Sequence, residues 1–167
     1  MELTEAKQKF IQTWGMLGSS WGINRTMAQI HALLLVAPHS LSAEEIMEEL
    51  QISRGNANMN LRALIDWNIV HKEIKPGERK EFFKTEKDVW KLAREVTKQR
   101  RKREIEPVLK TLNELQELKS DKSEEAEEFK NMTKELLNFT EKMDNTMDKF
   151  ERSDEHWFYK NILKLIK

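Results

Sequence analysis

The spacing of apolar and polar positions between residues 41 and 67 predicts two short helices joined by a tight turn. The first helix begins beside Ser42, and Glu45 follows three residues later, which is the spacing of a capping box. Ser53 is placed to cap the second helix, which we expect to run from Arg54 to about Trp67. Two helices in this arrangement are typical of a helix-turn-helix.

A β-hairpin is expected directly after the second helix. An extended run over residues 69–74 leads into Lys75-Pro76-Gly77-Glu78, which places Pro and Gly at the central positions of a type II turn. A second extended run over residues 79–85 returns along the first. Helix, helix and hairpin together predict a winged helix-turn-helix in which the hairpin is the wing.

Further helices are predicted on both sides of this motif. Before it, a helix from Glu2 to about Leu17 has large apolar residues along one side: Leu3, Phe10, Trp14 and Leu17. The glycines at 15, 18 and 22 permit close packing or a bend next to Trp21. A second helix, residues 25–36, follows Asn24, which is a good capping residue.

After the wing, a helix is predicted over residues 86–106, and Pro107 should break or kink it because proline lacks an N–H. The next helix, over residues 125–150, repeats its apolar residues in heptad-like steps of three and four: Phe129, Met132, Leu136, Phe139, Met143, Met147 and Phe150. A last, strongly apolar helix is expected to start near Ser153 and to include Trp157 and Ile166. Such helices suit packing in a bundle or across a dimer.

The predicted fold class is therefore mainly α, a winged helix-turn-helix with a small β-hairpin wing plus N- and C-terminal dimerisation helices. We expect three regions: residues 1–23 form an N-terminal dimerisation helix, residues 24–86 a winged helix-turn-helix DNA-binding domain, and residues 87–167 a helical dimerisation region. One recognition helix covers too few base pairs for useful specificity, so we expect a homodimer on a palindromic site.

The second helix of the motif has one apolar and one polar face. At about 100° per residue, the core side is made of Ala57, Leu61, Leu64 and Ile65. The other side is rich in Asn and Arg and carries no carboxylate before Asp66. Such a face suits the major groove of double-stranded DNA, because Arg pairs with guanine and Asn with adenine. The alternative is an ordinary solvated helix face, although such faces elsewhere in this chain carry Glu and Lys.

These considerations select the candidate DNA contacts. On the recognition helix they are Ser53, Arg54, Asn56, Asn58, Met59, Asn60 and Arg62, and on the wing they are Lys75, Arg79 and Lys80. Gly55 and Ala63 are small enough to let the backbone approach DNA. The preceding helix carries a row of carboxylates that would repel phosphate and that speaks against DNA contact: Glu44, Glu45, Glu48 and Glu49. We expect this row to face solvent, away from the DNA.

The segment from Ile52 to Trp67, with Ser-Arg-Gly-Asn-Ala-Asn-Met-Asn at positions 53–60, resembles the recognition-helix segment of the GbsR-type branch of the MarR-like winged-helix transcriptional regulators. The wing, from Gly77 to Phe83 and on to Asp88, is similar to the same branch. The resemblance is best over residues 21–90, and beyond Arg103 only helical character and length match. It implies a dimeric repressor or activator, and some members answer to choline or related osmolytes.

Composition excludes several classes of site. The chain of 167 residues has no cysteine and four scattered histidines, so neither a cysteine-based metal site nor a metal-binding histidine pair is expected. It also lacks a phosphate-cradling Gly-rich loop and any catalytic motif, so we predict no enzyme, no metal and no cofactor. The first residues contain neither a basic segment nor a long apolar run, so we expect no signal peptide, no membrane partner and a cytoplasmic location.

The formal net charge is zero, but the charges are unevenly distributed. Residues 1–104 contain 18 Lys and Arg against 14 Asp and Glu, whereas residues 105–167 contain 11 against 15. This division fits a DNA-binding part and an acidic helical part. The basic tract from Lys98 to Arg103 could contact phosphate or pair with the acidic C-terminal helices. A winged helix can also serve as a protein-interaction or assembly subunit without sequence-specific DNA binding, and that alternative stays open.

Five tryptophans are many for a chain of this length. Aromatic faces attract cations, quaternary ammonium ions above all, and Trp14, Trp21 and Trp90 lie outside the recognition surface. We expect them either to be core residues or to line a pocket for a small effector such as choline.

Overall fold

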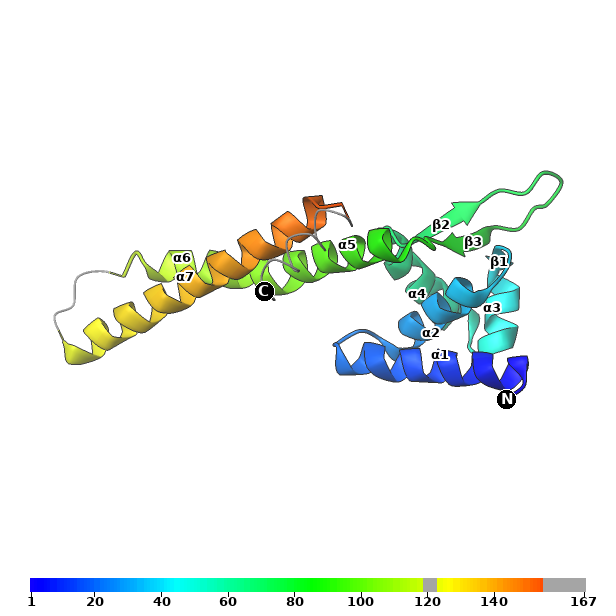
Figure 1. Ribbon diagram of the computed structural model, residues 1–167, viewed down its shortest axis with the longest axis horizontal. Coiled ribbons are helices and arrows are strands. Elements are labelled where there is room, and N and C mark those ends of the chain that lie inside the picture. The colour runs from blue at the N-terminus through cyan, green and yellow to red at the C-terminus, as the bar shows by residue number, and fades with distance from the viewer. Residues whose placement is uncertain (119–122, 155–167) are drawn as a thin grey trace, which may run out of the picture. The chain divides into compact units, whose positions relative to one another are not determined.

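The structure, a computed structural model, describes residues 1–118 and 123–154 (Figure 1). The chain divides into two compact units, Met1–Leu92 and Ala93–Lys167. The described residues are mainly helical, with one small three-stranded antiparallel sheet. The predicted mainly α fold class with a winged helix-turn-helix is thus confirmed. None of the helices within the described ranges combines the length and apolarity needed to cross a membrane.

The first unit contains the winged helix and the helix that precedes it. Its elements are α1 (Leu3–Ser20), α2 (Arg25–Val36), β1 (Leu41–Ser42), α3 (Ala43–Leu50), α4 (Arg54–Asp66), β2 (Val70–Glu73) and β3 (Phe82–Thr85). The sheet order is β1-β3-β2, and both pairs of strands are antiparallel. Strand β1 was not predicted, because two residues are too few to show an alternating pattern.

The predicted helix starts are confirmed for α2, α3 and α4. The Asn24 side chain accepts hydrogen bonds from the backbone N–H groups of Thr26 and Met27, at 2.8 and 3.3 Å. Ser42 and Glu45 form the expected capping box at α3. Glu45 therefore has a pKa below its usual value, chiefly because the Ser42 backbone N–H donates to its carboxylate.

The buried face of α1 differs from the predicted one. Leu3 and Leu17 are exposed, and the buried positions are Ile11, Gly15 and Gly18. A Cβ atom added at Gly18 would lie 2.5 Å from the Cβ atom of Ala28 on α2. The side of α1 with Gly15 and Gly18 packs against α2, because a residue without a side chain permits so close an approach. The prediction is thus wrong for Leu3 and Leu17, whereas Phe10 and Trp14 are half-buried and Trp14 donates to His31 of α2.

The core of the first unit lies between α2, α3, α4 and the sheet. Its fully buried large side chains come from all of these elements: Ile30, Leu34, Ile46, Leu61, Leu64 and Val70. Burial of side chains of this size stabilises a fold by about 1.5–3 kcal/mol each. This core holds α4 by one face and leaves its other face in solvent.

The second unit contains most of α5 (Val89–Arg100), which crosses the boundary between units, then a π-helical turn (Arg101–Ile105), α6 (Glu106–Leu115) and α7 (Glu124–Arg152). The helix predicted from residue 86 begins later, because Asp88 caps α5 by accepting from the N–H groups of Trp90 and Lys91. Pro107 occupies the first turn of α6, directly after the π-helical turn. The helix expected beyond Ser153, with Trp157 and Ile166, lies outside the described residues.

An ion-pair cluster joins the π-helical turn to α7. The Arg101 guanidinium donates to both carboxylate oxygens of Asp144, at 2.6 and 3.0 Å, and to Asp148 at 3.2 Å. This hydrogen bonding holds the pKa of Asp144 below its usual range. The expectation that the basic tract pairs with acidic C-terminal helices is confirmed for Arg101, whereas Arg100 pairs with Glu104 within its own turn.

Candidate nucleic-acid interface

Helix α4 separates apolar and polar residues between its two faces. The inward side chains of Ala57, Leu61 and Leu64 are at most 2% exposed, as predicted. The outward face is exposed at Arg54, Gly55, Asn58, Met59 and Arg62, and Asn56 is half-buried. Most of the predicted recognition residues are therefore accessible along one helix.

Asn60 is the exception, and its expected place on the outward face is wrong. It is only 2% exposed, because it stands three residues after Ala57 and four before Leu64, within the stripe that faces the core. Its amide nitrogen donates to the backbone oxygen of Asn56 at 2.9 Å and to the side-chain oxygen of Asn56 at 2.7 Å. The polar side chain is thus satisfied inside the protein.

The start of α4 is fixed by local contacts. The Ser53 hydroxyl accepts from the N–H of Asn56 at 3.4 Å and caps the helix. The Arg54 guanidinium lies 3.7 Å from the Glu44 carboxylate of α3, with 71% of its side chain exposed. An ion pair this exposed holds its partners weakly, so Arg54 stays available to another anion.

The wing has the predicted turn. The N–H of Glu78 donates to the Lys75 carbonyl at 3.1 Å, and Gly77 has φ +84°, which a type II turn requires. Strand β3 begins only at Phe82, so Arg79 and Lys80 lie in the loop and not in the predicted strand. Both are exposed, and neither forms an ion pair with any described residue.

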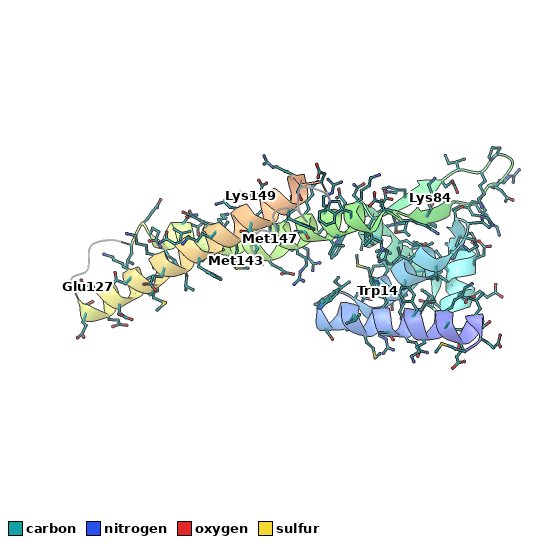
Figure 2. The ribbon with its side chains drawn as sticks, in the orientation of Figure 1. Trp14, Lys84, Glu127, Met143, Met147 and Lys149 are labelled. Atoms are coloured by element: carbon teal, nitrogen blue, oxygen red, sulfur yellow. The ribbon has the colours of Figure 1, made fainter. Side chains whose placement is uncertain are left out.

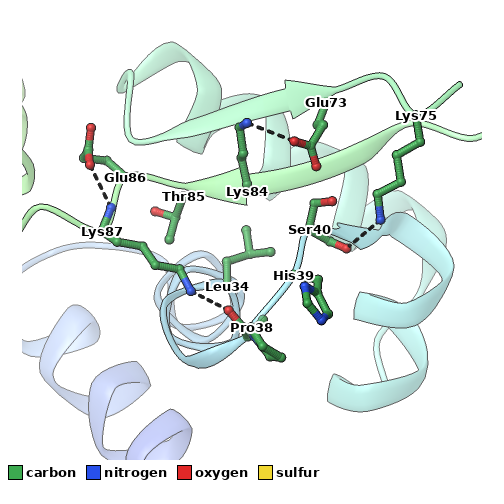
Figure 3. A pocket seen from close by; sticks show the side chains of 11 residues that line it. Leu34, Pro38, His39, Ser40, Glu73, Lys75, Lys84, Thr85, Glu86 and Lys87 are labelled. Carbon is green, nitrogen blue, oxygen red and sulfur yellow. Dashed lines mark hydrogen bonds and ion pairs between the residues drawn. The ribbon is translucent and has the colours of Figure 1, made fainter.

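Lys75 points away from the wing tip (Figure 3). Its Nζ atom donates to the Ser40 carbonyl at 3.5 Å and lies 3.9 Å from the centre of the Phe82 ring. It lines a cavity of about 520 Å³ whose walls also include Lys84 and Lys87. Lys75 is therefore held against the body of the winged helix, unlike Arg79 and Lys80.

Of the four carboxylates of α3, two have partners within the protein and two border a hollow that α4 does not line. Glu44 faces Arg54, and Glu45 completes the capping box. Glu48 and Glu49 border a hollow of about 340 Å³ that is lined by residues of α1, α2, α3 and the segment after α2, and by none of α4 or the wing. Glu44 thus lies beside the candidate interface at Arg54, whereas Glu48 and Glu49 border a hollow to which α4 and the wing contribute no residue.

The three tryptophans proposed for an effector lie in different settings. Trp14 is half-buried, donates from Nε1 to His31 Nδ1 at 3.4 Å, and contacts Phe10 at 5.4 Å between ring centres. Trp21, at the end of α1, is 52% exposed, and Trp90 is half-buried in the first turn of α5. None of them lines the cavity in Figure 3.

Comparisons with known proteins support the fold. No family model matches the sequence, and no curated protein matches it. Among solved structures, the crystal structure of a transcriptional regulator is similar, with a TM-score of 0.58 and 19% sequence identity; the match covers 86% of this chain and 99% of that one. At this identity the likeness concerns the fold.

Proposed function

We propose that the protein is a non-enzymatic, DNA-binding transcriptional regulator that acts as a homodimer on a palindromic operator. The observation that carries this is the outward face of α4, which has no carboxylate from Arg54 to Ile65 and exposes Arg54, Asn58 and Arg62. The similar fold of a transcriptional regulator supports it. A cytoplasmic location is part of the proposal.

In this mechanism α4 enters the major groove and the wing contacts the backbone or minor groove. Arg62 and Arg54 are suited to guanine or phosphate, because a guanidinium donates two parallel hydrogen bonds. Arg79 and Lys80 contribute charge that is independent of sequence. Gly55 has open space where a side chain would stand, so the α4 backbone can come close to DNA.

The direct test is selection of genomic fragments with the purified full-length protein, followed by gel-shift titration of the enriched sites. We expect one enriched palindromic sequence bound far more tightly than a scrambled duplex. A specific observation, the acidic exposed side of α3, favours a second candidate, a winged-helix protein-interaction or assembly subunit without sequence-specific DNA binding. Equal recovery of all fragments would favour that candidate.

The homodimer part rests on α7. Five large apolar side chains of its heptad-like stripe are 40–62% exposed: Phe129, Met132, Leu136, Phe139 and Met143. The buried positions of α7 are small and seven residues apart, namely Ala126, Thr133 and Thr140. A hollow of about 300 Å³ runs along Phe139, Met143 and Met147, the last two labelled in Figure 2. A second copy of α7 has the matching pattern of knobs for such a stripe.

Light scattering at micromolar concentration tests the dimer, and twice the chain mass is expected. Phe139→Glu should shift the protein to the monomer mass, because it places a charge within the apolar stripe. Asn145→Glu adds the same charge at an exposed position of α7 outside the stripe and should leave the dimer intact. A folded wild-type monomer would contradict this part of the proposal.

The effector part follows the resemblance to the GbsR-type branch and proposes a choline-like cation at some of Trp14, Trp21 and Trp90. Seven residues, about 10.5 Å along the helix axis, separate Trp14 from Trp21, so one small cation contacts one of these two rings closely. Choline and glycine betaine are titrated while tryptophan fluorescence and operator affinity are recorded. Absence of a saturable change up to millimolar concentration excludes a quaternary ammonium effector.

A further inference from the structure

The buried Asn60 and the half-buried Asn56 form a pair within the first two turns of α4. Asn60 is 2% exposed, and the same amide nitrogen donates to the backbone oxygen of Asn56 at 2.9 Å and to its side-chain oxygen at 2.7 Å. Asn56 is the third residue of the helix, and its own N–H is occupied by the Ser53 cap. Two contacts therefore restrain the backbone and side chain of Asn56.

The backbone carbonyl of Asn56 fixes the orientation of the side-chain amides of both Asn56 and Asn60. A carbonyl oxygen only accepts, so the Asn60 atom next to it must be the amino nitrogen. Because that nitrogen also contacts the Asn56 side chain, the Asn56 atom facing it must be the oxygen. The usual ambiguity between oxygen and nitrogen in asparagine is thereby removed for this pair.

The pair restricts which group Asn56 can present to DNA. Its side-chain oxygen is turned toward Asn60, so its amino group, which only donates, is directed away from the helix body. The bidentate pair of asparagine with adenine needs both the oxygen and the nitrogen on the same base edge. An Asn56 held in this way can donate to N7 of guanine or adenine, to guanine O6 or to thymine O4, and it meets no acceptor on the cytosine edge.

We propose that Asn60 is a positioning residue that fixes the Asn56 amide with its amino group outward, so that α4 disfavours cytosine at the base it contacts through Asn56 and does not single out adenine by a bidentate pair. This inference rests on the proposed DNA-binding function. Residues in the N-terminal part of a recognition helix contact base edges, and Asn56 lies in that part. The role of Asn60 is thus exerted through Asn56 and not by contact with DNA.

The experiment combines Asn60→Leu, which keeps the shape but removes the donor, with Asn56→Ala and the double variant. Each full-length protein is measured against the selected operator with all four bases at every position. Asn56→Ala should abolish the preference at one base pair per half-site. Asn60→Leu should reduce the same preference about fivefold, as expected for one hydrogen bond, and should add nothing in the Asn56→Ala background.

The matched control is Thr85→Val. The Thr85 hydroxyl is buried and donates to the Ile69 carbonyl at 2.7 Å, so its loss also removes a buried hydrogen bond from the same unit. It should lower stability without changing base preference. If Asn60→Leu weakens binding to all sequences alike, as Thr85→Val would, Asn60 is merely structural and the inference is overturned.

A measurement on the wild-type protein covers the case in which Asn60→Leu does not fold. In the free protein, NMR should show slow solvent exchange for the Asn60 side-chain amide and fast exchange for that of the exposed Asn58. Equal rates would overturn the inference. A wild-type protein without any sequence preference would defeat the proposed function as well, whereas a preference that Asn60→Leu leaves unchanged would defeat only the role of Asn60.

Discussion

His31 makes stability depend on pH in a window that can be calculated. It lies in α2, is 6% exposed, and accepts a hydrogen bond at Nδ1 from Trp14 of α1. Burial lowers its pKa from 6.5 to about 4, because the imidazolium would lose its hydration there. His31 is therefore neutral in the folded protein under conditions in which the unfolded chain is protonated.

The sign follows from proton binding. Well above pH 6.5 His31 is neutral in both the folded and the unfolded state, so it does not lower the free energy of unfolding. Between pH 6.5 and about 4 the unfolded state binds more protons, so the free energy of unfolding decreases as the pH falls. At pH 5 the loss is about 2 kcal/mol, and the full loss below pH 4 is about 3 kcal/mol.

Urea unfolding of the wild type and of His31→Gln at pH 7.5 and 5 measures this effect, at one chain concentration because a dimer would make stability concentration-dependent. Glutamine keeps an acceptor for Trp14 but does not titrate. The wild type should lose about 2 kcal/mol more than His31→Gln between the two pH values. An equal loss in both proteins would show that His31 is accessible to protons in the folded state.

Two further predictions concern α4 with the wing, and α1. Arg62→Ala should weaken operator binding by about 1–3 kcal/mol and relax its sequence preference. Lys80→Ala should weaken binding to all sequences alike and reduce the salt slope by about 1. Unchanged binding in both variants would show that the DNA interface lies elsewhere. In thermal unfolding, Gly18→Leu should destabilise the first unit by more than about 1 kcal/mol, because the added side chain separates α1 from α2. Gly55→Ala is the control: its side chain meets open space, and it should stabilise the unit by about 0.5–1 kcal/mol. Equal melting temperatures for Gly18→Leu and the wild type would refute the close packing.

Local sequence signals predicted the helix starts and the wing turn. A cap needs one side chain beside a few backbone N–H groups, so Asn24, Ser42 and Ser53 carry the information within four residues. The Gly77 turn is local in the same sense. These elements define the winged helix, which explains why its fold class follows from the sequence.

Positions that depend on a neighbouring element were predicted less well. The side of α1 that packs depends on how closely α2 approaches Gly18. The pattern of apolar residues along α1 does not encode that distance. The helical periodicity predicts Asn60 beside the outward face, whereas the structure buries it with Ala57 and Leu64. Asn60 stands at the edge between the two faces of α4, so its burial depends on how α4 packs against its neighbours and is not encoded in the spacing alone.

The net charge of zero still allows a calculable dependence of DNA binding on salt. On α4 and the wing, Lys72 and Lys84 are paired with carboxylates at 2.7 and 3.0 Å and Lys75 is held by Ser40, as seen among the described residues. The remaining cations of these elements are Arg54, whose exposed pair with Glu44 is weak, and Arg62, Arg79 and Lys80, which form no ion pair within the described part of the chain.

Two copies would therefore bring about eight cations to phosphate, and the logarithm of the binding constant should fall with the logarithm of salt with a slope of about −7. Gel-shift titrations between 50 and 200 mM salt measure this slope. A slope near −10 would mean that other cations, such as the basic tract from Lys98 to Arg103, reach the DNA. A slope near zero would mean that α4 and the wing do not contact phosphate, and the proposed interface would be refuted.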